Sequence, residues 1–306
     1  MPSRLHAVYA RVVPRVRKAE EMGGPEPEER ARVERWHARL DRTFPTRAVP
    51  GFHRRFTIET DQHGGFPTYV VTPRRRPATR TLCYLHGGGY MAPLDPFQIR
   101  YATRLATAVD ARVVVPDYPL APEHTWRDSH DAVVEVAAQW AAEPGGLALV
   151  GDSSGGGYAL AVAIALRDRG LPQATHLVLH APWVDLTTST PETDAYDEVD
   201  PWLFIRKLRA YALWWAGSPE DLGRPEVSPA LADLGGLPPG LMFCGTRDLL
   251  VPGCRLLARR AAAAGWDLTY VEEPGLIHAY PVLPWLPEAR PAFRQTVAFL
   301  QEPGLR

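Results

Sequence analysis

Short apolar runs of strand length recur along the chain, separated by longer stretches rich in helix-forming residues. The later runs lie near residues 81–85, 111–115, 147–150, 177–180, 240–244 and 268–272. An earlier pair, 56–60 and 68–72, flanks Gly64-Gly65 and predicts a β-hairpin. Because strands that alternate with helices are joined by crossovers, the pattern predicts an α/β fold with a mainly parallel central sheet flanked by helices.

Composition narrows the class of protein. With 306 residues, 45% of them apolar, the chain is long enough for one α/β domain with a large core. The net charge of -1 gives no electrostatic reason to expect nucleic acid or an anionic membrane as a partner. No run approaches 18 apolar residues, and basic residues interrupt residues 1–20, so we expect neither a membrane span nor a signal peptide.

Cysteine usage points to a reducing compartment. The chain has 3 cysteines, Cys83, Cys244 and Cys254, and two of them fall within predicted core strands. An odd number with no regular spacing favours free thiols over a disulfide framework or a zinc site. We therefore expect a cytoplasmic protein with no metal.

The segment Gly151-Asp152-Ser153-Ser154-Gly155-Gly156 contains the pattern G-x-S-x-G. It follows the apolar run 147–150 and precedes a second apolar stretch, 158–166, with helix formers. Strand, sharp turn and helix form the context of a nucleophile elbow, which exposes a serine hydroxyl at the tip of a strand. The alternative is an ordinary strand-to-helix loop in which Ser154 is the N-cap.

A second glycine-rich segment, His86-Gly87-Gly88-Gly89, directly follows the apolar run 82–85. Acyl transfer requires N–H donors for the oxyanion of the tetrahedral intermediate, and losing one donor costs about 10²–10³ in rate. We assign these donors to the backbone of Gly88, Gly89 and Ser154. The alternative is a tight glycine turn without such a role.

In this order the motifs resemble those of the hormone-sensitive-lipase-like group of bacterial serine esterases, called family IV, which have the α/β-hydrolase fold. The resemblance covers roughly residues 80 to 300. Its motifs are HGGG at 86–89, DYPLAPE at 117–123, GDSSGG at 151–156, PWVDLT at 182–187 and GLIH at 275–278. It implies that the His86 ring braces the glycine loop, and it favours small esters or lactones as substrates.

The remaining partners of Ser153 follow from the chain order serine, acid, histidine of α/β-hydrolases. His278 lies beyond the late strand 268–271, at the end of a predicted loop over 272–277, and we assign it as the general base. In the family a G-T-x-D pattern carries the acid, and Gly245-Thr246-Arg247-Asp248 matches it.

Other interpretations of these polar residues remain open. Asp248 could be an exposed turn residue or a partner of Arg247, and its rivals as the acid are Asp233 and Asp267. Asp152 adjoins the nucleophile, but its side chain is expected to point away from the substrate. Asp117 and Glu123 are expected to be structural, tying down the loop after strand 111–116.

Two stretches do not fit the sheet. Residues 1–48 are interpreted as a helical cap segment broken at Gly23-Gly24-Pro25, ahead of a catalytic domain over 49–306. Residues 185–225 form a long insertion with a helix around 201–215. Its apolar stripe is typical of core packing, but its place in the chain favours a cap over Ser153. The candidate substrate-binding residues are Trp202, Phe204, Leu208 and Trp214.

These features predict a serine carboxylesterase that hydrolyses short-chain esters through an acyl-enzyme, with no metal or organic cofactor. A lactone hydrolase, a deacetylase or an amidase would use the same groups. A non-catalytic receptor for a small ligand, built on the same fold, is a different class of protein. A small ester is the expected partner, and a homodimer is left open.

Overall fold

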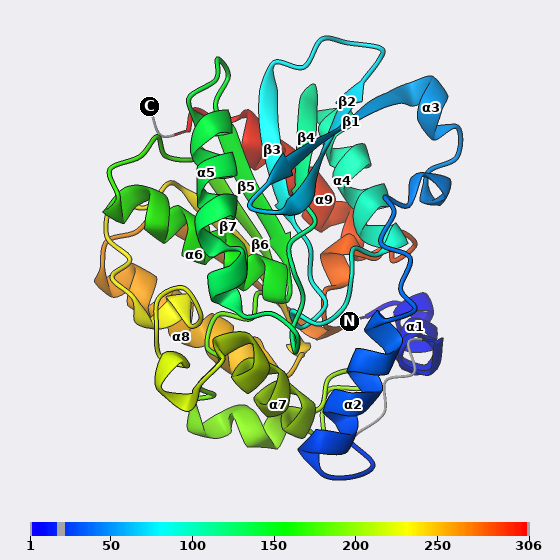
Figure 1. Cartoon of the computed structure of the whole chain (residues 1–306), viewed down its shortest axis with the longest axis vertical. Helices are drawn as coiled ribbons and strands as arrows, with labels where there is room; N and C mark the ends of the chain where they lie inside the picture. Colours follow the sequence, from blue (N-terminus) through cyan, green and yellow to red (C-terminus); the bar gives the residue numbers. More distant parts are fainter. Residues whose placement is uncertain (1, 17–21, 305–306) are drawn as a thin grey trace.

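The computed structural model describes residues 2–16 and 22–304, arranged around one sheet of eight strands in the order β1-β2-β4-β3-β5-β6-β7-β8 (Figure 1). The strands β1 and β2 form an antiparallel hairpin, β2 is antiparallel to β4, and the other pairs are parallel. The bounds are β1 Phe56–His63, β2 Phe66–Pro73, β3 Arg80–Leu85, β4 Ala111–Pro116, β5 Leu147–Asp152, β6 His176–His180, β7 Gly240–Arg247 and β8 Leu268–Ile277. The predicted α/β-hydrolase fold is confirmed.

Helices cover both faces of the sheet and exclude water from its apolar side chains. The helices α4 and α9 pack on one face, and α5, α6 and α8 pack on the other. The long helices have the bounds α1 Arg4–Val16, α2 Glu26–His37, α4 Pro96–Ala108, α5 His130–Ala141, α6 Ser154–Asp168, α7 Ile205–Ala216, α8 Val251–Ala263 and α9 Ala289–Gln301, and α3 is a short turn at Phe52–Arg55. Every residue of the central strand β5 is buried.

Local sequence explains where α4 begins. Asp95 accepts a hydrogen bond from the backbone N–H of Phe97, and the side chain of Gln98 accepts one from the N–H of Asp95, which together form a capping box. Pro96 occupies the first turn, where its missing N–H costs nothing. This start brings the Gln98 side chain beneath the carboxyl end of β5.

The segment 272–277 is strand, not the predicted loop. The strand β8 pairs with β7 as far as Ile277, but between the pairs Gly245–Glu273 and Arg247–Ile277 one residue of β7 faces three residues of β8. Gly275 lies in this irregularity with a φ of 76°, which glycine adopts readily. A Pro-Gly pair normally indicates a loop, but here it lies within β8 and forms a bulge.

The helix α7 begins later than predicted, at Ile205 instead of Pro201. The carboxylate of Asp200 accepts the N–H groups of Trp202 and Leu203, and that of Asp197 accepts the N–H of Ile205. Aspartate side chains that bind nearby backbone in this way compete with helix formation. Residues 201–204 therefore form a turn.

The helices α2 and α7 lie side by side, below the carboxyl ends of the strands in Figure 1. The hydroxyl of Tyr211 on α7 donates to Glu29 on α2 at 2.6 Å, and the indole of Trp214 donates to Glu26. The two predicted helical segments thus meet, and the break between α1 and α2 falls where the sequence predicts it. Part of that break, residues 17–21, lies outside the described residues.

Candidate active site

Ser153 occupies a strained turn between β5 and α6. Its backbone angles are φ 53° and ψ -127°, a region that non-glycine residues rarely adopt. The turn is held because the N–H of Ser153 donates to His180 on β6 at 2.9 Å. Glycine is required two residues later, since a Cβ at Gly155 would overlap the carbonyl oxygen of Leu85. The geometry is that of the predicted nucleophile elbow.

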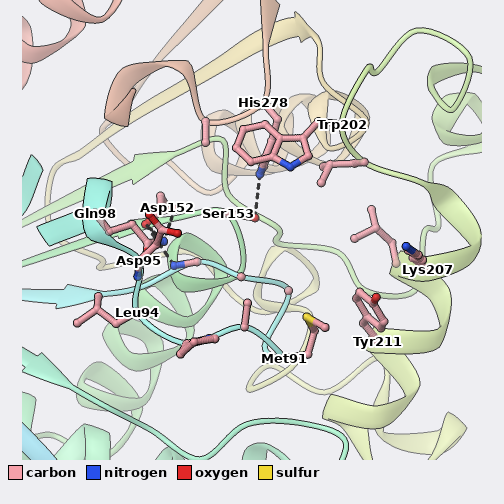
Figure 2. Close-up of a pocket in the computed structure, with 18 of the residues that line it drawn as sticks. Met91, Leu94, Asp95, Gln98, Asp152, Ser153, Trp202, Lys207, Tyr211 and His278 are labelled. Carbon is pink, nitrogen blue, oxygen red and sulfur yellow. Dashed lines mark hydrogen bonds between the residues drawn. The ribbon is translucent and has the colours of Figure 1, made fainter. Parts of the chain in front are cut away.

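The structure brings the three predicted reacting side chains together. The imidazole Nε2 of His278 lies 3.0 Å from the hydroxyl of Ser153 (Figure 2). Its Nδ1 lies 2.8 Å from Asp248. The other carboxylate oxygen of Asp248 accepts the N–H of Leu250 at 2.9 Å, which fixes its orientation. With Nδ1 donating to the carboxylate, Nε2 is free to accept the serine proton.

Burial and charge oppose each other at His278. Burial alone lowers the pKa of its imidazole, but the nearby carboxylates of Asp248 and Asp200 favour the charged form. The net result is a pKa above the usual 6.5. The group is therefore a stronger base than an exposed histidine.

The glycine loop beside Ser153 presents backbone N–H groups. Gly88 has a φ of 131° and Gly89 a φ of 62°, both positive values that favour glycine. Within residues 2–16 and 22–304, the N–H groups of Gly88, Gly89 and Ser154 donate to no protein acceptor. Ser154 begins α6, so its N–H also carries the positive end of the helix dipole. These donors suit an oxyanion.

Asp152 braces this arrangement from below. Its buried carboxylate accepts hydrogen bonds from the Tyr84 hydroxyl at 2.6 Å, the Gln98 amide at 2.9 Å and the N–H of Gly87 at 3.2 Å. It therefore ties the glycine loop to the residue that precedes Ser153. Burial raises its pKa, although these hydrogen bonds oppose the rise.

A second support lies behind the glycine loop. The ring of His86 stacks on Tyr118 with centroids 4.4 Å apart, and the Tyr118 hydroxyl donates to the His86 carbonyl at 2.6 Å. The guanidinium of Arg42 holds the next turn through Asp117 at 2.6 Å. Glu123 pairs with His37 at 2.7 Å, so the motif at 117–123 also anchors the N-terminal segment.

The structure adds Asp200, which the sequence analysis did not single out. Its carboxylate is buried and accepts the N–H of Leu249, the residue after Asp248, at 2.7 Å. Burial, together with the negative charge of Asp248, raises its pKa to about 7. Asp200 lies in the long insertion, where no motif or strand pattern marks it.

A cavity of about 860 Å³ opens above Ser153. Figure 2 shows Trp202, Lys207 and Tyr211 on one side of it, with Met91, Leu94 and the Asp95 turn opposite. Three of the predicted substrate-binding residues, Trp202, Phe204 and Leu208, line it. The helix α2 and the turn after it contribute a further wall made of Arg32, Arg35, Trp36 and Arg39.

Trp214 does not line the cavity, which corrects its predicted role. Its side chain is buried, and its indole N–H donates to Glu26 of α2. The sequence could not separate the two sides of α7, because apolar residues of the helix lie on more than one of its sides. Trp214 joins the two helices that flank the cavity.

Two negative findings bear on the site. In the described part of the chain, no cluster of three or more histidine, cysteine or acidic side chains could hold a metal ion. None of the helices formed by residues 2–16 and 22–304 is both long and apolar enough to cross a bilayer.

Comparison with known proteins places this geometry in a family. Residues 82–282 match a family model described as the alpha/beta hydrolase fold. An acetyl-hydrolase from Streptomyces hygroscopicus is 34% identical over 236 residues, covering 76% of this chain and 78% of that protein. An esterase from Acinetobacter venetianus is 28% identical over 226 residues, covering 72% and 75%.

The solved structures agree with the sequence comparisons. One of them, an esterase from the bacterial hormone-sensitive lipase family, superposes with a TM-score of 0.80 at 26% identity, covering 98% of this chain and 99% of that one. The chain therefore belongs to the hormone-sensitive-lipase-like family IV of bacterial esterases, within the α/β-hydrolase superfamily.

Proposed function

We propose that this protein is a serine carboxylesterase that hydrolyses short-chain carboxylic esters through an acyl-enzyme on Ser153. One observation carries the proposal: the hydrogen-bonded line from Asp248 through His278 to Ser153 ends in the cavity. A nucleophile, a base and an orienting acid at these distances form the constellation for acyl transfer.

The reaction proceeds in two halves. In the first, the Ser153 oxygen attacks the ester carbonyl, its proton moves to Nε2 of His278, and the N–H groups of Gly88, Gly89 and Ser154 hold the oxyanion. The intermediate collapses, and His278 returns the proton to the departing alcohol. In the second half, water attacks the acyl-enzyme with His278 again as base, which frees the acid and restores Ser153.

The cavity supports small substrates. Trp202, Phe204 and Leu208 place bulky apolar groups in the same cavity as Ser153. Each buried methylene contributes only about 0.8 kcal/mol, so added chain length gains little binding before it meets these side chains. We expect the highest kcat/KM for acyl chains of about two to six carbons.

Removal of acetyl groups from acetylated alcohols is the second candidate activity. It is favoured by the similarity to the Streptomyces acetyl-hydrolase. Acetate is the smallest acyl group in the proposed range, and the acyl-enzyme is the same. A non-catalytic receptor is disfavoured, because all three reacting groups are present and hydrogen-bonded.

The proposal extends to the organisation of the chain. Residues 1–48 and the insertion 185–225 would together form the cap over a catalytic domain that starts at residue 49. The contacts of Tyr211 with Glu29 and of Trp214 with Glu26 support a single cap built from both segments. The three buried cysteines, free of disulfides, support a location in the reducing cytoplasm.

Two measurements test the function. A panel of p-nitrophenyl esters of graded chain length, extended to lactones and acetylated alcohols, should give turnover with a short-chain optimum. A fluorophosphonate probe should label the wild type on Ser153, as mapped by mass spectrometry, and should leave Ser153→Ala unlabelled. A folded protein that cleaves no ester and takes no label would overturn the proposal.

A further inference from the structure

The wall that α2 contributes to the cavity carries a stripe of cations. Arg32 and Arg35 lie three residues apart on α2, and Arg39 follows four residues later in the turn after the helix, with Trp36 among them. All of them line the same cavity as Ser153, and Lys207 of α7 lines it as well. The cavity therefore places positive side chains near the reacting hydroxyl.

The carboxylates in the neighbourhood compensate only part of this charge. Glu29 is held by Arg32 through two hydrogen bonds of 2.7 Å, and it lies 4.0 Å from Lys207. Of the acidic residues that line the cavity, Asp95 caps α4, and Asp152 is buried beneath the glycine loop.

Arg35 and Arg39 have no ion-pair partner within residues 2–16 and 22–304. By contrast Arg30, elsewhere on the same helix and outside the cavity lining, pairs with Glu34 at 3.0 Å. The two unpaired arginines lie where α2 and the turn after it line the cavity.

If Arg35 and Arg39 faced only water, an ordinary solvated surface would explain them. Here the same cavity also holds Trp202, Leu208 and the Ser153 hydroxyl. A cleft lined by one sign of charge between low-dielectric walls focuses the field and concentrates ligands of opposite charge. A guanidinium also matches a carboxylate with two parallel hydrogen bonds.

We propose that the natural substrate is an anionic ester, with a carboxylate distal to the scissile bond that Arg35 and Arg39 bind. The inference rests on the proposed esterase activity and narrows its substrate class. The ester carbonyl occupies the site at Ser153, and the charged end of the same molecule extends toward α2. Arg32 stays paired with Glu29, so the uncompensated charges are those of Arg35 and Arg39.

The test uses pairs of substrates that differ only in charge. On the acyl side, mono-p-nitrophenyl adipate is compared with its methyl ester, and nitrophenol release is followed for both. On the alcohol side, 4-acetoxybenzoate is compared with methyl 4-acetoxybenzoate. In wild-type protein at low salt, we expect the anionic member of at least one pair to have a kcat/KM about tenfold higher. High salt should reduce that preference.

The double variant Arg35→Gln/Arg39→Gln should lower the ratio of anionic to neutral kcat/KM about tenfold, mainly through KM. The double lysine variant should restore part of that ratio. The matched control is Arg75→Gln, an exposed arginine on the turn after β2, outside the cavity lining. It removes one positive charge and should leave the ratio unchanged.

The outcomes separate this inference from the proposed function. Equal kcat/KM for both members of both pairs, or a preference that the glutamine variant retains, overturns the anionic substrate and leaves the esterase intact. If the folded wild type cleaves neither member of either pair, the proposed function fails first.

Discussion

The indole ring of Trp202 lies edge-on to the imidazole of His278, with ring centroids 5.5 Å apart and planes 79° apart. Trp202 belongs to the insertion, whereas His278 follows the last strand of the sheet. The insertion thus covers the base directly and helps to exclude water from it. For that reason the protonation of His278 depends on the insertion as well as on Asp248.

The first prediction concerns pH. Hydrolysis needs neutral His278, so kcat/KM for a neutral ester should rise with pH through the ionisation of this group. Because the nearby carboxylates raise its pKa above 6.5, the rise should be centred above pH 6.5 and activity should be lost below it. A pH profile of kcat/KM checks this, and a midpoint below pH 6 would contradict it.

Asp200→Asn should shift this profile to lower pH. The variant removes one of the carboxylates that favour the charged imidazole, so the pKa of His278 falls. The matched control is Asp197→Asn, which alters the cap of α7 but does not act on His278. If both variants keep the wild-type midpoint, Asp200 only holds the backbone of Leu249.

The three reacting residues should behave as a unit. Ser153→Ala and His278→Ala should each fold normally and lose nearly all esterase activity, and their double variant should be no worse than either alone. Asp248→Asn should lower kcat by about 10⁴, because the amide favours the wrong tautomer of His278. Steady-state kinetics and circular dichroism provide the measurements, and near-wild-type activity of Asp248→Asn would show that another carboxylate orients the base.

Leu208→Ala should favour longer acyl chains. The substitution opens room in the cavity for about two methylenes, each worth about 0.8 kcal/mol when buried. The ratio of kcat/KM for octanoate to that for butyrate should therefore rise by up to about fifteenfold. Trp214→Phe, on the side of α7 that faces Glu26, should keep the wild-type chain-length profile. Identical profiles in all three proteins would exclude Leu208 from the acyl site.

Arg42→Ala should destabilise the fold. The guanidinium binds the buried carboxylate of Asp117 at 2.6 Å and the carbonyl of Tyr118 at 2.8 Å, and its removal leaves Asp117 unpaired. We expect a loss of about 2–3 kcal/mol in the free energy of unfolding, measured with urea. Arg76→Ala breaks the exposed pair with Asp110 and should cost less than about 1 kcal/mol. Equal losses would contradict this account.

The sequence predicts the elements that carry strong local signals. Alternation of apolar runs with helix formers indicates the strands. The glycines around Ser153 mark the elbow because a Cβ at Gly151 or Gly155 would overlap backbone atoms. His278 follows from chain order. The path of the chain that leads to His278 does not follow from the sequence. A Pro-Gly pair normally ends a strand, but here it lies within β8 as a bulge.

Tertiary contacts determine the rest. Asp200 approaches Asp248 only because the insertion folds back over the strand ends, and a lone aspartate in a long insertion carries no sign of this. Trp214 and Leu208 lie on one helix with many apolar residues. Their spacing in the sequence therefore does not show which of the two side chains faces the cavity. The arginines of α2 likewise appear as an ordinary charged helix until the cavity is seen to include them.

The reacting groups stand at strand ends, whereas much of the cavity wall comes from α2, the turn after it and the insertion. Because of this separation, the residues that line the cavity can change independently of the residues that react. Substitutions along 26–39 or 201–211 can change which molecules enter, while the register of the sheet preserves the chemistry. Related hydrolases can thus acquire new substrate specificities through substitutions in these two segments. Engineering of a new selectivity can begin with the same few positions.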